Sequence, residues 1–128
     1  AIEVNLDYTV VSNCGQVDMY VEATGFHWAN GPAVPEIQPI ALDEEAGVVV
    51  VVADATLVSG QNPLVFTGDG DLIDGLASRR TETISYQSAK HTFDSVAAVT
   101  VKWDQSDPNQ PAGVYEAKVN LACIVQAP

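Results

Sequence analysis

Residues 2–10 alternate strictly between apolar and polar side chains, and this pattern limits what the chain can fold into. The odd-numbered positions Glu3, Asn5, Asp7 and Thr9 are polar, and the even-numbered positions are apolar: Ile2, Val4, Leu6, Tyr8 and Val10. Successive side chains of a β-strand point to opposite faces, so the stretch predicts a strand with one apolar face. That face lines either the core of its own domain or a surface offered to another molecule.

Similar alternation recurs along the chain, at 17–23 and again at 97–103. No window sustains an apolar period of 3.6 residues, and turn signals recur about every 8–14 residues, a spacing typical of an all-β sandwich. At 128 residues the chain is expected to form one domain. We therefore predict an all-β antiparallel β-sandwich.

Two segments carry more specific expectations. The apolar run Val48–Ala53 holds five consecutive valines, which predicts a strand covered on both faces and is too short to span a bilayer. Residues 79–93 are mostly polar and predict an exposed strand or hairpin arm. Arg79 and Arg80, the only adjacent basic residues, are expected in a surface turn.

The charge of the chain narrows the classes of partner. Seventeen acidic residues stand against five basic ones, for a formal net charge of −12. Such a surface repels nucleic-acid backbones and anionic membranes, so neither is expected as a partner. The sequence starts at Ala1 without an initiator Met, as after cleavage of a signal peptide. We expect an exported, extracellular protein.

The two cysteines lie near opposite ends of the chain. Cys14 continues the even-numbered register of the first strand, and Cys123 continues the odd-numbered apolar register of the last. Each thiol thus shares the apolar side of its own strand. This parity predicts a Cys14–Cys123 disulfide in an oxidising compartment, and two buried free thiols are the alternative.

Few residues suggest chemistry. Asp69, Asp71 and Asp74 share a glycine-rich acidic loop, where carboxylates can converge on Ca²⁺, although a solvated acidic turn is the alternative. His27 and Trp28 offer a small aromatic patch of the kind that binds carbohydrate, or a plug at one end of the sandwich. The sequence has no GxSxG motif, P-loop or dinucleotide fingerprint. We expect no catalytic residues and no cofactor besides this candidate Ca²⁺ site.

Two stretches carry a family resemblance. The closing segment NQPAGVYEAKVNLACIV resembles the last strand of fimbrial subunits, in which a Pro, small residue, Gly, any residue, Tyr turn leads into an alternating strand. The opening AIEVNLDYTVVSNC resembles the N-terminal extension of the same subunits. The resemblance is to pilins of the chaperone–usher type, including the archaic branch related to spore-coat U proteins.

The resemblance implies that the β-sandwich is an incomplete immunoglobulin-like one. It also implies donor-strand exchange, in which the N-terminal strand of one subunit fills a groove in the next. Residues 1–11 would form the donor strand and residues 12–128 the sandwich domain. The donor side chains would be Ile2, Val4, Leu6, Tyr8 and Val10. The groove-facing side chains of the terminal strand would be Tyr115, Ala117, Val119 and Leu121. An assembly chaperone or usher would be a further partner.

The sequence therefore predicts a structural subunit of an extracellular filament, a pilus or fimbria, that polymerises with copies of itself. The alternative is a monomeric secreted β-sandwich that binds carbohydrate or Ca²⁺, with its first strand paired inside its own sheet. Burying five apolar side chains at about 1.5–3 kcal/mol each suffices to hold a subunit interface. An exposed strand of this kind would also be an aggregation hazard on a monomer.

Overall fold

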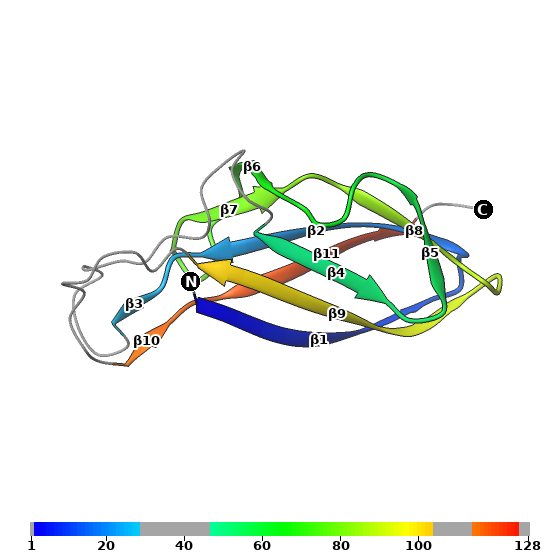
Figure 1. Ribbon diagram of the computed structural model, residues 1–128, viewed down its shortest axis with the longest axis horizontal. Helices are drawn as coiled ribbons and strands as arrows, with labels where there is room; N and C mark the ends of the chain where they lie inside the picture. Colours follow the sequence, from blue (N-terminus) through cyan, green and yellow to red (C-terminus); the bar gives the residue numbers. More distant parts are fainter. Residues whose placement is uncertain (1, 29–46, 104–113, 126–128) are drawn as a thin grey trace.

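Antiparallel β-strands account for all the regular secondary structure in the described part of the chain, residues 2–28, 47–103 and 114–125 (Figure 1). The side chains of Ile2, His27, Trp28 and Val125 lie outside this description. In this computed structural model the strands form two facing sheets, which confirms the predicted all-β sandwich. Among the described residues no helix is long and apolar enough to cross a membrane.

The smaller layer is a three-stranded sheet in the order β1-β9-β4. Strand β1 spans Ile2–Ser12, β9 spans Phe93–Trp103 and β4 spans Val48–Val52. β1 pairs with β9 over eleven consecutive residues without a register shift, from Ile2 opposite Trp103 to Ser12 opposite Phe93. The N-terminal strand therefore lies at the edge of a sheet of its own chain.

The larger layer is a six-stranded sheet built around β2, Gln16–Thr24. β11, Val119–Val125, pairs with one edge of β2, and β7, Ser78–Thr81, and β8, Ile84–Ser88, share the other. β5, Ala55–Ser59, and β6, Phe66–Asp69, continue the sheet outward from β8 and β7. A separate two-stranded ribbon pairs β3, His27–Trp28, with β10, Tyr115–Glu116.

Alternating side chains of the two sheets meet in one core. Val17, Met19 and Val21 of β2 are fully buried, as are Val99 and Val101 of β9. The even-numbered valines of β4 complete this layer together with side chains from neighbouring segments: Val48, Val50, Val52, Leu64, Phe66, Ile84 and Phe93. The period-two patterns at 17–23 and 97–103 thus mark core faces, as predicted.

Two local expectations are wrong. Val51, the fourth of the five consecutive valines, is 57% exposed, because only the even-numbered side of β4 faces the other sheet. Residues 79–93, predicted to be an exposed strand or hairpin arm, contain an interior strand instead. This strand is β8, which lies between β5 and β2 and buries Ile84 and Tyr86. Its polar residues find partners across the sheet: the Ser85 hydroxyl donates to Asp18 Oδ1.

The predicted Cys14–Cys123 disulfide is wrong: both cysteines are free thiols. Cys123 lies opposite Met19 in the β11–β2 ladder, whereas Cys14 precedes β2 and lies five residues before Met19 in the chain. That offset corresponds to on the order of 15 Å along a strand, well beyond the reach of a disulfide. The odd or even position of a cysteine predicts the face of the strand on which its thiol lies. It does not predict how far along the strand the thiol lies, and here that distance keeps the two cysteines apart.

The two thiols are expected to differ in reactivity. Cys14 is buried, whereas Cys123 is exposed at the sheet edge. The protein atoms around its sulfur still shield it partly from water, which raises the pKa of the Cys123 thiol. In denaturant without reductant, a thiol reagent should find two groups per chain. In the native protein Cys123 should react first and Cys14 only on opening, and single serine variants would assign the two rates. An unreduced, denatured chain with no reactive thiol would contradict the structure.

Candidate functional site

An open groove of about 380 Å³ runs between β1 and the C-terminal strands. One wall consists of the β1 side chains Val4, Leu6 and Tyr8. The other wall and the floor come from segments far away in sequence: Phe26, Trp103, Tyr115, Glu116, Ala117, Lys118 and Val119. The groove is thus lined mainly by apolar and aromatic side chains, with one acidic and one basic residue among them.

Hydrogen bonds and ring packing hold the floor of the groove together. Trp103, at the end of β9, is 1% exposed, and its indole Nε1 donates a hydrogen bond to the carbonyl of Thr24 at 2.8 Å. The ring of Phe26 packs against it with centroids 4.5 Å apart and planes at 58°. Thr24 is tied in turn to Lys118, whose backbone N–H donates to Thr24 Oγ1 at 2.8 Å. These contacts hold the start of β11 in place beside the end of β2.

One side-chain hydrogen bond crosses the groove. The hydroxyl of Tyr8 donates to the carbonyl of Val119 at 3.1 Å, which links the edge strand of one sheet to the edge strand of the other. Burial raises the pKa of Tyr8, so the hydroxyl keeps its proton beyond its ordinary range. Val4 and Leu6 on the same side of β1 are only half-buried, so the groove is open toward solvent along this part of β1.

The other sheet edges in the described residues are shorter or closed. On β4, Val50 N–H donates to Asn62 Oδ1 at 3.2 Å and Asn62 Nδ2 donates to Val50 O at 2.8 Å, so this side chain occupies the backbone edge. Val48 and Leu64 exchange two backbone hydrogen bonds beside it. β5 and β6 are short, and each has a register shift in its ladder. Among the described strands, β1 and β11 therefore have the long, regular edges to which another strand could be added. These two strands form the walls of the groove.

The groove brings together the two residue sets that the sequence predicted as donor and acceptor. Val4, Leu6 and Tyr8 of the expected donor strand face Ala117 and Val119 across it. Tyr115 lines the groove as well, Leu121 packs against the core nearby, and Val10 is buried at the far end of β1. The side chain of Ile2 lies outside the described residues. In the isolated chain these contacts form within one molecule.

The three aspartates proposed for Ca²⁺ do not converge. Asp69 pairs with Arg79 in the β6–β7 ladder, and Asp71 Oδ2 lies 3.3 Å from an Arg80 nitrogen. Asp74, with φ 53°, and Gly75, with φ 79°, form a tight turn closed by hydrogen bonds between residues 73 and 76. No group of three or more potential ligands is arranged for a metal ion within the described residues.

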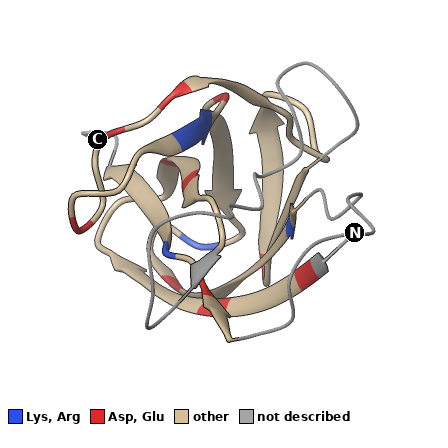
Figure 2. Cartoon of the chain, turned by 90° about the vertical axis from the view of Figure 1, so that its left-hand side faces the viewer, with Lys and Arg blue, Asp and Glu red and all other residues tan. Residues whose placement is uncertain are grey.

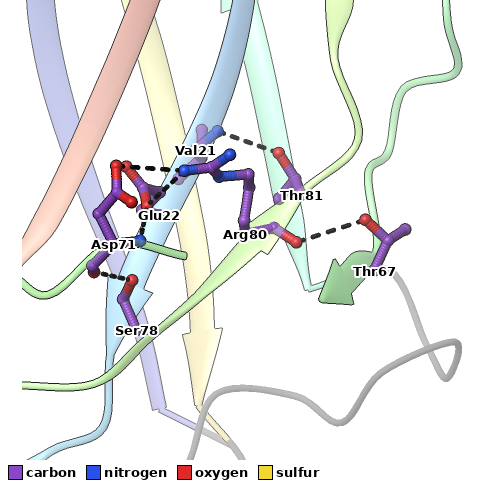
Figure 3. A network of polar contacts seen from close by, with 7 residues as sticks. All are labelled: Val21, Glu22, Thr67, Asp71, Ser78, Arg80 and Thr81. Atoms are coloured by element: carbon purple, nitrogen blue, oxygen red, sulfur yellow. Dashed lines mark hydrogen bonds and ion pairs between the residues drawn. The ribbon is translucent and has the colours of Figure 1, made fainter. Parts of the chain in front are cut away.

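The acidic loop is instead fastened to the outer face of the larger sheet by Glu22 (Figure 3). This carboxylate is 4% exposed, and its Oε2 accepts hydrogen bonds from the Asp71 backbone N–H at 2.6 Å and from Arg80 at 3.3 Å. The Arg80 guanidinium carbon lies 4.5 Å from the Tyr20 ring centroid. Arg80 therefore belongs to a strand and an ion pair, which corrects the predicted surface turn.

Sequence reasoning missed Glu22 because it sits on the polar side of an alternating strand, where a charge is ordinarily solvated. One sequence feature is consistent with a closely packed loop here, namely Gly70 between Asp69 and Asp71. A Cβ at this position would lie within 3 Å of both Glu22 Oε2 and Ser78 Oγ, so any other residue would force these side chains to shift. Figure 2 marks the acidic positions of the chain in red and the basic positions in blue.

Comparisons of the chain with protein-family models, with curated proteins and with solved structures gave no match. The interpretation of the groove therefore depends on its own geometry and chemistry.

Replacing Tyr8 by Phe should lower the free energy of unfolding by about 0.5–1.5 kcal/mol, because the Val119 carbonyl loses its donor. Urea denaturation measures this, with Tyr20→Phe on the outer face of the larger sheet as the control. The raised pKa of Tyr8 means that the unfolded chain releases this proton first above about pH 10, so stability falls there. Y8F should lose less stability over that alkaline range. Equal stability of Y8F and the parent at neutral pH would exclude the bond.

Replacing Gly70 by Ala should destabilise the protein by about 1–3 kcal/mol, because the new methyl group collides with Glu22 and Ser78. Gly68 is the matched control, since a Cβ there meets nothing within 4 Å. Thermal melts of G70A and G68A, compared with the parent, measure both effects. A melting temperature for G70A equal to that of G68A would show that the loop does not pack on Glu22.

Proposed function

We propose that this protein is a structural subunit of an extracellular filament, a pilus or fimbria. Its subunits join head to tail when the N-terminal strand of one is donated to the next. The domain is then an immunoglobulin-like sandwich with an exchangeable strand and no catalytic role, and an assembly chaperone or usher would be a further partner.

The observation that carries this proposal is the position of β1. It is a long edge strand whose apolar side chains contact the C-terminal strand across an open groove, so a neighbour's strand can make the same contacts. Main-chain hydrogen bonds supply affinity in such strand addition, and alternating side chains supply the register. A head-to-tail contact of this type does not close on itself and generates an open polymer.

The second candidate function is a monomeric secreted binding module. β1 pairs with β9 of its own chain along its whole length, as a stable monomer requires. The groove also presents aromatic side chains from Tyr8, Phe26 and Tyr115, a surface type that suits carbohydrate. The backbone of Trp28 lies opposite Tyr115 in the β3–β10 ribbon. Under this alternative the protein remains a monomer at all concentrations.

Native material should elute as large assemblies in size-exclusion chromatography and show filaments in negative-stain microscopy. A variant with Val4→Asp and Leu6→Asp should lose the filaments, because both carboxylates enter the groove. The matched control with Asn5→Asp and Thr9→Asp adds the same charge to the exposed face of β1 and should keep them. Circular dichroism verifies that each variant is folded. A native protein found only as a 13.5 kDa monomer would contradict the filament proposal.

A further inference from the structure

The attachment of β1 to the rest of the domain is unusually simple. Within the described residues its ladder partner is β9 alone, and the strand that follows it in sequence, β2, lies in the other sheet. β1 ends at Ser12 and β2 begins at Gln16, so three residues connect the layers. β1 can consequently leave β9 without breaking any other strand pairing of the described residues.

The segment between β1 and β2 is attached to the larger sheet at its β2 end, through Gly15. The carbonyl of Gly15 accepts a hydrogen bond from Ser88 N–H at 2.8 Å, which fixes the start of β2 to the larger sheet. On the β1 side, the N–H of Cys14 donates to Ser12 Oγ at 3.0 Å, a local contact that can travel with the strand. A rotation that releases β1 while the Gly15 hydrogen bond is kept would therefore fall at residues 12–14. Short connections between packed elements favour exchange between copies over closure within one chain.

The register of β1 on β9 is specified on both faces. On the inner face, Tyr8 reaches the Val119 carbonyl at 3.1 Å. On the outer face, the Thr100 hydroxyl donates to Asn5 Oδ1 at 2.7 Å, and Glu3 lies opposite Lys102. A slip by one residue would turn Glu3, Asn5 and Asp7 toward the groove and lose all of these contacts. A second copy of β1 would therefore select this register over any other.

We propose that β1 of one subunit takes, on β9 of the next, the same eleven-residue register that it holds here on its own β9. This inference rests on the proposed filament function and names β9, with the groove wall of β11, as the acceptor. The intrachain pairing is then the unassembled form of the subunit. Because the two pairings use the same backbone edge, they exclude each other, and a subunit must open before it can accept a neighbour.

The test is a pair of cysteines at opposed positions, Asn5→Cys with Thr100→Cys, in a chain whose own cysteines are replaced by serine. Residues directly opposite in an antiparallel ladder have Cβ atoms about 4.5–5.5 Å apart, close enough for a disulfide to form with a small adjustment. The control pair is Asn5→Cys with Val96→Cys. Val96 lies opposite Thr9, four residues out of register with Asn5, and should give no link.

Assembled filaments, oxidised and run on a denaturing gel without reductant, should give a ladder of covalent multimers with the matched pair and only single chains with the control. Monomer oxidised before assembly should form the link within one chain. It should then fail to assemble until a reductant is added, because the locked β1 blocks the acceptor edge.

The contrary results separate the two proposals. Filaments that contain only intrachain links, or locked monomers that assemble as fast as reduced ones, would overturn strand exchange and leave the filament intact. Filaments with unlinked thiols at positions 5 and 100 would overturn the register on β9. A parent protein that forms no filament under any condition would contradict the proposed function itself, and the exchange with it.

Discussion

The sandwich depends on β9, the strand that holds the smaller sheet together. It carries β1 on one edge and β4 on the other, while its odd-numbered side chains form the core layer that meets β2. Trp103 at its end extends this role, because its indole anchors Thr24 and forms the floor of the groove. The core and the groove are therefore parts of one packed unit, and changes at the end of β9 reach both.

Period-two alternation was sufficient to predict the fold class. In β2 and β9 the apolar register coincides with burial at nearly every position, because each strand has one face on the core and one on solvent or a loop. The pattern failed where neighbours decide the outcome. Val51 is apolar yet exposed, and β8 is polar yet interior, because burial there depends on which strands lie alongside. Strand order is a tertiary property that local periodicity does not contain.

Only part of the candidate site could be predicted from local sequence patterns. Part of the set named for the first and last strands lines one groove: Val4, Leu6, Tyr8, Tyr115, Ala117 and Val119. Strands of opposite sheets that present apolar faces inward meet at the open side of a sandwich, which brings these side chains together. The cysteines and the aspartates were not predictable in this way. Whether Cys14 meets Cys123, or Asp71 meets Asp74, depends on heights along strands and on Arg80, whose positive charge beside Asp71 opposes a bound cation.

The distribution of edge protection bears on the proposed strand exchange. Asn62 and Leu64 close the β4 edge, and register shifts interrupt β5 and β6, so these edges are poor sites for an added strand. The ladders of β1 and β11 have no register shift, so this form of protection is missing from their edges. Under the proposed strand exchange, a second β1 in the same register on β9 would place the same apolar side chains, Val4, Leu6 and Tyr8, beside the groove.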